Sequence, residues 1–580
     1  MSKRKKRPFD VPQRAESSKE SRQRDAQKEA KNKEEGKTNF FNDRGVRETI
    51  ESIVVAVMLA LIFRTYEAEA FVIPTGSMAP TLQGRHLETV CDKCGYRYIT
   101  GASNENPGER NDGFIFDTVC PICRYEQTHK RKTSGFRTNE DSFTGDRILV
   151  SKFAYDLSEP QRWDVIVFKF PGNAKQNYIK RLIGLPNETV LLINGDIYVS
   201  RNDEPAEIAR KPPDKLKAML QLVDDTNFVA AQLKAAGWPS RWQEWDAPAD
   251  NRTWTVSETD KPVFTAAKAD QEAWLRYRHI IPRSEEWSDI ERGNLPVRLQ
   301  DFQGELITDY YAYNDAAPGA RPGDSRFRKS DKNEFGDHWV GDLAVEADLK
   351  IESDSGQVGF DLVEGGTHFT CWIDVATGKA TISSDDLAIV FGGSSGNPNP
   401  VAETRIKKPG NYDVRFANVD NELTLWINNK VVMFDVPLTY IREEVLTPKW
   451  SKNDPGDAEP IGIGSRGAKI SVSRIKLLRD VYYVANQSDV RLHSFADDPT
   501  SWEKPASIEL IQISAVGDAE PFKLLEDQFM PLGDNSPSSL DARVWKHVDR
   551  SMLTGQALYI YWPHAWRPFW PNFRRMGFIH

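Results

Sequence analysis

Hydrophobic and polar residues follow three patterns along this chain of 580 residues. Apolar residues run without a break through 53–63. Their neighbours are compatible with a helix over 46–68, which spans roughly 30 Å. Before this helix, residues 1–45 contain too few apolar side chains to bury a core, and we predict a disordered tail. After it, short runs of Val, Ile and Phe alternate with turn residues, a pattern typical of β-strands.

The predicted strands fall into two groups on either side of residue 200. In the first group, the turn Asn194-Gly195-Asp196 joins two strands into a hairpin. The strands of this group cover 147–153, 165–170, 178–184, 188–193 and 197–200. In the second group, a β-sandwich is predicted from short, regularly spaced strands at 343–351, 358–363, 369–373 and 423–427. A helix is expected over 215–222, and the predicted fold class is mainly β.

Composition and charge narrow the classes of function. Charged residues make up 28% and aromatic residues 11% of the chain, as in a folded, water-soluble protein, and 580 residues require several domains. The net charge of −9 argues against a general nucleic-acid binder. The charge is uneven, because residues 1–47 hold 15 Lys/Arg and only 8 Asp/Glu.

The apolar run at 53–63 has two interpretations. It is shorter than the ~20 residues that span a bilayer, but flanking residues lengthen it, with Glu51 and Arg64 at the two interfaces. A cleavable signal peptide has an apolar core of the same length. We favour a membrane anchor, because a long segment precedes the run and a serine motif follows it at once. The positive-inside rule then keeps the basic tail in the cytoplasm and puts the following residues on the outer side.

Two candidate catalytic side chains follow this segment. Ser77 lies in a turn between Pro74 and Pro80, which stiffen the backbone. A serine becomes a nucleophile only when a base lies beside it. Lys180 is the candidate base, because its apolar and β-branched neighbours would desolvate the ammonium and lower its pKa.

Further blocks accompany these two stretches, at 145–153, 162–169 and 533–543. In this order after a hydrophobic segment, the five blocks resemble bacterial type I signal peptidase, a Ser-Lys endopeptidase. The matched motifs cover less than a third of the chain, near 46–84, 145–200 and 507–563. The resemblance implies a signal-peptidase-like β core. It also implies a membrane-bound serine endopeptidase that removes signal peptides from exported preproteins and needs no cofactor for catalysis.

The resemblance further implies roles for individual residues. Ser77 would be the nucleophile and Lys180 the general base, oriented by Ser539. The Thr75 hydroxyl and the Ser77 N–H would stabilise the oxyanion, and a charged cluster would brace the site: Arg181, Asp541 and Arg543. The residues that match a substrate pocket for small side chains are Ile73, Pro74, Met78, Leu82, Tyr178 and Ile179. The sequence departs from the family at Asn187-Glu188, in place of Gly-Asp, and at Ala542, in place of a serine, which leaves the geometry of those turns open.

Two Cys-x-x-Cys pairs lie in an insertion at 84–144, between the serine block and the next block: Cys91, Cys94, Cys120 and Cys123. Their spacing predicts a zinc ribbon, in which two hairpin tips surround one structural ion. Disulfides are the alternative, because this segment should lie outside the cytoplasm. A disulfide within each pair would, however, close a small strained loop. Cys371 stands alone downstream and is expected to be a buried apolar residue.

These observations divide the chain into a cytoplasmic tail (1–45), a transmembrane anchor (46–68), a catalytic core in two parts (69–200 and 507–580) and an insertion (201–506). The core ends in an interfacial C-terminal tail. Parts of the insertion resemble concanavalin-like jelly rolls, so we expect a concanavalin-like β-sandwich. Its many Trp residues could bind a glycan, or the domain could bind a protein, but aromatic side chains of a sandwich more often belong to its core. The other expected partners are signal peptides and the lipid bilayer, and no nucleic acid. The predicted location is the cell membrane, in a single pass, with the catalytic domain on the periplasmic side.

Two other functions remain open. A Ser-Lys protease could act on another substrate class, as self-cleaving repressors do, although no DNA-binding segment is visible. A membrane-tethered protein could instead use an inactive peptidase core as a binding module, which the intact Ser77, Lys180 and Ser539 oppose. Because 201–506 contributes no matched block, we expect a variant with a short linker in its place to retain peptidase activity.

Overall fold

A computed structural model describes residues 44–66, 68–105, 115–129, 142–202, 204–245, 252–257, 259, 261–283, 286–296, 304–314, 336, 338–393, 396–442, 446–451, 453–484, 522–563, 565–566 and 570–580. The predicted tail up to residue 43 and the predicted end of the insertion near residue 506 lie outside these residues. The chain divides into two compact units, Met1–Glu69 and Ala70–His580.

In the first unit, the helix predicted over 46–68 is present as α2 (Arg44–Tyr66), which has 23 residues. Several of its apolar side chains are exposed: Ile50, Ile53, Val54, Val55, Val57 and Met58. In the ranges that the structure describes, no helix combines the length and the apolar character needed to cross a membrane.

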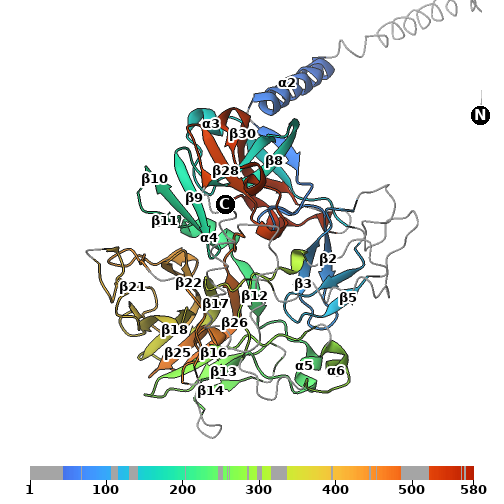
Figure 1. The fold of residues 1–580 in the computed structure, drawn as a ribbon. Coiled ribbons are helices and arrows are strands. Elements are labelled where there is room, and N and C mark those ends of the chain that lie inside the picture. Colours follow the sequence, from blue (N-terminus) through green and yellow to red (C-terminus); the bar gives the residue numbers. More distant parts are fainter. Residues whose placement is uncertain are drawn as a thin grey trace, which may run out of the picture. The chain divides into compact units, whose positions relative to one another are not determined.

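In the second unit, one eight-stranded sheet combines strands from both ends of the sequence. Its order is β1-β6-β30-β7-β8-β28-β29, and β33 pairs with β30. The strands are β1 (Ala68–Val72), β6 (Arg147–Ser151), β7 (Val165–Phe170), β8 (Asn173–Gly184), β28 (Gln528–Leu532), β29 (Val548–Asp549), β30 (Leu553–Trp562) and β33 (Gly577–Phe578). Figure 1 shows the red β28 and β30 among the strands that precede residue 200, and β28 pairs with β8. The predicted strands at 147–153, 165–170 and 178–184 are confirmed.

The predicted hairpin around Gly195 belongs to a second sheet of four strands. Its order is β11 (Glu207–Ile208), β10 (Asp196–Arg201), β9 (Glu188–Ile193) and β27 (Phe522–Lys523). Asn194 and Gly195 join β9 to β10 with φ of 53° and 92°, the left-handed conformations that a two-residue hairpin turn requires. The turn prediction is therefore confirmed.

Two larger sheets fill most of the region between residues 221 and 479. The first has the order β14 (Trp254–Val256), β15 (Phe264–Ala266), β26 (Ile470–Arg479), β17 (Leu343–Ile351), β22 (Gly410–Val419), β23 (Glu422–Ile427) and β24 (Lys430–Val431), and β12 (Gln221–Asp225) also pairs with β26. The second has the order β13 (Trp242–Glu244), β16 (Ala273–Tyr277), β25 (Ile461–Arg466), β18 (Gln357–Glu364), β19 (Thr367–Asp374), β20 (Lys379–Ser384) and β21 (Val401–Glu403). Val345 and Phe416 of the first sheet share one buried core with Phe360 and Ile463 of the second. The four strands predicted in this region are present.

The cysteine segment forms two short hairpins. They are β2 (His86–Val90) with β3 (Arg97–Gly101), and β4 (Asp117–Val119) with β5 (Glu126–Thr128). The other strand pair is β31 (Ala565–Trp566) with β32 (Trp570–Pro571). The remaining helices are short: α3 (Ala154–Leu157), α4 (Pro213–Met219), α5 (Ala231–Ala235), α6 (Trp287–Glu291), α8 (Ala542–Trp545), and the 3₁₀ turns η6 (Ala312–Asn314), η10 (Gly456–Ala458), η12 (Ser536–Ser538), η13 (Arg550–Met552) and η14 (Phe573–Arg575).

The helix predicted over 215–222 is wrong at its C-terminal end. Helix α4 stops at Met219, and Leu220 already has the extended ψ of 132°. Gln221 and the residues after it form β12, because the edge of β26 offers them backbone hydrogen bonds. Cross-strand pairing with a distant segment therefore outweighs the helical propensity of this short run.

The second unit is continuous from the first sheet to the sandwich. Lys211 lies just after β11, and its Nζ lies 2.8 Å from Asp420 Oδ1 and 2.7 Å from Asp480 Oδ2 of the sandwich. All three side chains are buried. The N–H of Tyr483 also donates to the carbonyl of Gly195 in the β9–β10 turn, at 3.0 Å. These contacts fasten the sandwich to the smaller sheet.

Candidate active site

The structure brings Ser77 and Lys180 together. Ser77 lies in the loop that follows β1, and Lys180 lies on β8. Lys180 Nζ is 2.5 Å from Ser77 Oγ and donates to the carbonyl of Ile179 at 3.1 Å. Both side chains are buried, with residue exposures of 8% for Ser77 and 4% for Lys180. A lysine amine and a serine hydroxyl in direct contact can exchange a proton.

Burial alters the protonation of Lys180. Desolvation lowers the pKa of its ammonium from the usual 10.5 to about 8. Asp541 and Asp534 act in the opposite direction, and the charge of Arg543 contributes to the lowering. Because the site is short of compensating charge, a useful fraction of Lys180 is neutral near neutral pH, as a general base must be.

Asn535 holds the loop that carries Ser77. Its backbone N–H donates to the Ser77 carbonyl at 3.1 Å, and its side-chain amide donates to the Gly76 carbonyl at 3.0 Å. Ser103, near the cysteine hairpins, accepts from the Gly76 N–H at 3.1 Å. The loop is thus fixed on both sides of the serine.

The insertion also supports this loop. Asn314 and Asn535 exchange two side-chain hydrogen bonds, of 2.6 and 2.7 Å. The ring of Tyr313 packs so closely on Gly76 that a Cβ there would lie 2.4 Å from Tyr313 Cε1. A role of 201–506 in shaping the site was not predicted from the sequence, and it removes the basis for expecting a linker variant to stay active.

The predicted charged cluster consists of two separate ion pairs. The guanidinium of Arg181 binds both oxygens of Asp534, at 2.7 and 2.8 Å, and donates to the carbonyl of Trp163. Arg543 binds both oxygens of Asp541, at 2.8 and 2.7 Å. All four of these side chains have 3% or less of their surface exposed. Asp534, which accepts a hydrogen bond from Thr81 in the Ser77 loop at 2.6 Å, was not among the predicted site residues.

Ser539 and Thr75 differ in their surroundings. Ser539 is buried beside Gly533, where a Cβ would lie 2.1 Å from Ser539 Oγ and 2.4 Å from the Ser77 carbonyl oxygen. Ser539 therefore lies next to the Ser77 backbone, where a hydroxyl can contribute to the site. Thr75 is exposed, two residues before the buried Ser77.

The residues predicted to line a substrate pocket separate into three groups. Ile73, Met78 and Leu82 are buried together under the Ser77 loop, with Ile179 packed against them. Tyr178 instead packs against Phe168 and Leu182 on the other side of the strand, and Pro74 is exposed. Met78 and Leu82 have no exposed surface. These two side chains are therefore closed to solvent, while Pro74 and Ile179 retain exposed surface.

The four predicted cysteines meet at the tips of the two hairpins. Cys91 Sγ lies 3.5 Å from Cys123 Sγ, Cys94 Sγ lies 3.6 Å from Cys120 Sγ, and all four sulfurs lie within 4.8 Å of one another. These separations exceed the ~2.05 Å of a disulfide, and approach the ~3.8 Å between sulfurs of a tetrahedral zinc–thiolate site. The four thiols could therefore hold one metal ion. Cys371 is buried in the sandwich core, as predicted.

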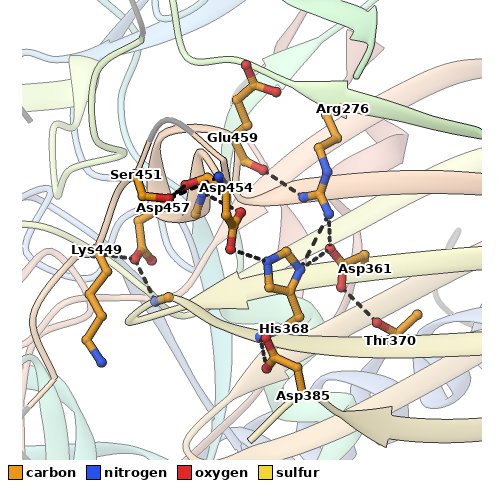
Figure 2. Close-up of polar contacts among 12 residues, drawn as sticks. Arg276, Asp361, His368, Thr370, Asp385, Lys449, Ser451, Asp454, Asp457 and Glu459 are labelled. Atoms are coloured by element: carbon orange, nitrogen blue, oxygen red, sulfur yellow. Dashed lines mark hydrogen bonds and ion pairs between the residues drawn. The ribbon is translucent and has the colours of Figure 1, made fainter. Parts of the chain in front are cut away.

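A further polar cluster lies on the outer face of the second sandwich sheet (Figure 2). Asp361 accepts from Arg276 at 2.6 Å, from His368 Nδ1 at 2.8 Å and from Thr370 at 3.0 Å, while His368 Nε2 lies 3.1 Å from Asp454. Burial lowers the pKa of His368, but the two carboxylates outweigh it and raise the pKa to about 10. The imidazole is therefore charged at neutral pH and donates from both nitrogens.

Two tryptophans flank this cluster. Trp274 on β16 and Trp372 on β19 are separated in register by Gly464 and Gly359. Their rings lean across these glycines to lie 5.0 Å apart, and a Cβ on Gly359 would come within 2.8 Å of both rings. The glycines therefore make room for the Trp274–Trp372 platform, two indole rings tilted by 60° to each other, with the guanidinium of Arg466 4.8 Å from the centre of the Trp372 ring.

Comparison with known proteins supports a signal-peptidase core. Residues 124–238, which include Lys180 but not Ser77, match the family described as "Signal peptidase, peptidase S26". Signal peptidase I of Rickettsia prowazekii is 30% identical over 169 residues, which are 29% of this chain and 48% of that protein. Signal peptidase I of Pseudomonas aeruginosa is 38% identical over 85 residues, or 11% of this chain and 30% of that protein. The chain thus spans about half the length of the first relative and less than a third of the second.

Among solved structures, a carbohydrate-binding module, CBM66 from Bacillus subtilis, aligns with 41% of this chain and 94% of its own length. Its sequence identity is 8% and its TM-score is 0.19. A TM-score this low carries no conclusion about the fold or ligand of the sandwich.

Metal binding by the cysteine hairpins can be measured directly. We expect one zinc per purified chain, and we expect Cys94→Ser and Cys120→Ser to lose it and to lower the Tm, because the hairpins are short. Elemental analysis and thermal unfolding test both points, with Cys371→Ala as the control that keeps its metal. Absence of zinc together with two disulfides in the mass spectrum would establish the disulfide alternative instead.

Proposed function

We propose that this chain is a Ser-Lys endopeptidase of the type I signal peptidase kind, which removes signal peptides from exported preproteins. The observation that carries the proposal is the 2.5 Å contact between Ser77 Oγ and Lys180 Nζ in a buried site. The family match and the partial similarity to signal peptidases support the same reaction class. No metal or cofactor takes part in the proposed chemistry.

In the proposed mechanism, neutral Lys180 accepts the proton of the Ser77 hydroxyl as Ser77 Oγ attacks the scissile carbonyl carbon. The oxyanion that forms is stabilised by the Ser77 N–H and the Thr75 hydroxyl, one such donor lowering a barrier by about 3 kcal/mol. Protonated Lys180 gives its proton to the leaving amine, and an ester to Ser77 remains. Lys180 then takes a proton from water as the water oxygen attacks the ester carbon, and it returns that proton to Ser77 Oγ when the Oγ–C bond breaks and the product acid leaves. Ser539 orients the lysine throughout.

The alternatives are weaker on physical grounds. An inactive core used only for binding gives no reason to keep a buried lysine, whose desolvation costs about 3 kcal/mol, in contact with a serine. A protease of another substrate class would use the same dyad. The partial similarity to signal peptidases favours signal peptides as the substrates.

The proposal includes a location at the membrane and a structural zinc ion. The exposed apolar side chains of α2, such as Ile53 and Val57, favour a membrane anchor. The basic tail would then remain in the cytoplasm, with Ser77 on the outer, periplasmic side. The cysteine hairpins would hold a structural zinc, whose role is to order a segment that includes Ser103 beside the Ser77 loop.

A second candidate function belongs to the sandwich, which would take a neutral glycan. Indole faces stack on the apolar face of a sugar ring, and nearby charged groups hydrogen-bond its hydroxyls. The Trp274–Trp372 platform supplies the first element, and Arg276, Asp361 and His368 supply the second. These charges are already paired with one another, which favours an uncharged ligand.

Substitution of the dyad is the direct test of the proposed peptidase. We expect Ser77→Ala and Lys180→Met each to abolish cleavage of a preprotein in detergent. Lys180→Met should not lower the Tm at pH 7, because it removes a buried charge whose desolvation costs about 3 kcal/mol. Cleavage products are followed by gel and mass spectrometry. Turnover at the wild-type rate by either folded variant would exclude the dyad.

The rate should depend on pH in a defined direction. The reactive form of Lys180 is neutral, so kcat/KM should rise with pH and level off above an apparent pKa of about 8. The measurement is a pH profile of kcat/KM with a short peptide substrate, from about pH 6 to about pH 10. A rate that falls as pH rises through 8 would contradict a lysine base.

Affinity electrophoresis in gels that contain a neutral polysaccharide tests the glycan site. We expect retardation of the wild-type protein and its loss in Trp274→Ala and Trp372→Ala, since each change removes a stacking face. The matched control is Phe573→Ala, which removes an exposed aromatic ring elsewhere. Wild-type protein that migrates freely through every gel of a panel of glucans, mannans and galactans would refute the proposal.

A further inference from the structure

A cavity of about 310 Å³ lies behind the loop that carries Ser77. Its walls come from three regions: the Ser77 loop with Pro80 and Gln83, the hairpin around Tyr98, and the sandwich with β12 and the end of β26. Tyr313 belongs to the wall and also packs on Gly76. The cavity is therefore adjacent to the candidate active site but separate from it. Its volume is that of a small ligand site.

Positive charge dominates the cavity. The lining includes Arg97, Arg124 and Arg479, and none of the described residues that line it is Asp or Glu. Arg97 has its ion-pair partner, Glu88, and is largely exposed, so it belongs to the rim. Arg124 is buried with its guanidinium 3.3 Å from the centre of the Tyr310 ring. An anion would complement these charges.

Arg479 lies buried in the wall without a carboxylate hydrogen bond among the described residues. Its guanidinium donates to the backbone carbonyls of Asp480 at 2.8 Å, Asp309 at 3.0 Å and Tyr310 at 3.2 Å. Carbonyls satisfy N–H groups without neutralising the charge, and a guanidinium has five N–H groups. Burial lowers the pKa of Arg479, and the nearby charges of Asp309 and Asp480 offset this only in part. A carboxylate in the cavity would add a direct counter-charge and accept a hydrogen bond from an N–H group that these carbonyls leave free.

Two buried acceptors add a second requirement. Gln83 Oε1 and Gln221 Oε1 have no hydrogen-bond partner among the described residues, and both residues are 6% exposed and line the cavity. A buried acceptor without a partner costs roughly 1–3 kcal/mol. Inorganic phosphate has O–H donors at neutral pH but no apolar part, so it meets this requirement only partly. A suitable ligand carries both a carboxylate and N–H or O–H donors, with apolar parts to contact Tyr310 and Tyr313.

We propose that this cavity binds the carboxyl-terminal end of a short peptide. The carboxylate would lie between Arg124 and Arg479, peptide N–H groups would donate to Gln83 and Gln221, and the tyrosines would contact the side chains. The lining of the cavity favours this ligand whether or not the chain is a peptidase. If the proposed peptidase activity is also correct, each cleavage produces a new carboxyl terminus of this class.

Isothermal titration with two matched probes tests the site. The full chain with Ser77→Ala serves as the host, so that binding is measured without cleavage and a failure of the proposed peptidase does not affect the result. The probes are N-acetyl-Ala-Ala with a free carboxylate and the same peptide as its amide. We expect the acid to bind at least tenfold more tightly than the amide, because only the acid neutralises Arg479.

Variants locate the binding. Gln221→Leu and Gln83→Met remove the acceptors while retaining volume, so they should weaken binding of the acid severalfold without lowering the Tm. Arg479→Gln should abolish the preference for the acid; if it fails to fold, the two glutamine variants decide. Arg550→Gln, at a surface ion pair, should bind as the host does. Equal binding of acid and amide, no binding of either, or displacement of the acid by equimolar inorganic phosphate would overturn the proposal.

Discussion

The candidate site depends on one energetically unfavourable burial. The amine of Lys180 is removed from water and held against the hydroxyl of Ser77. Holding this lysine away from water costs about 3 kcal/mol, and a chain that could relax would expose it. The surrounding structure prevents this relaxation. β8 lies between β7 and β28, and the Ser77 loop is closed over the amine by Asn535.

Neighbouring residues on β8 perform opposite tasks because side chains alternate along a strand. Lys180 points toward Ser77 and is left short of compensating charge, whereas Arg181 is fully paired with Asp534. Asp534 in turn accepts a hydrogen bond from Thr81, at the end of the Ser77 loop. The fully paired arginine therefore fixes the position at which the unpaired lysine meets the serine, and a register shift of one residue would exchange their roles.

Local patterns were sufficient to predict much of the fold. Val165–Phe170 and Leu343–Ile351 were predicted at their observed bounds, because β-branched runs flanked by turn residues have few other conformations. The Asn194-Gly195 turn and the meeting of the four cysteines likewise depend on short spacings. The end of α4 was missed, since pairing of Gln221 with Arg479 depends on a segment far along the chain.

The residues that hold the Ser77 loop in place could be predicted from the sequence only in part. Asp534 and Asn535 lay within a recognised block, so their position was a usable signal. Ser103, Tyr313 and Asn314 carry no motif, and only the folded chain brings them to Gly76 and Asn535. An insertion that had evolved as an independent domain would need only its two junctions. This one also joins the core through the hydrogen bond from the Tyr483 N–H to the Gly195 carbonyl, and it contributes a side of the cavity that Tyr313 shares with the nucleophile loop. The geometry of the serine and the folding of the sandwich are therefore linked, and a ligand in the cavity between them would contact residues of the Ser77 loop.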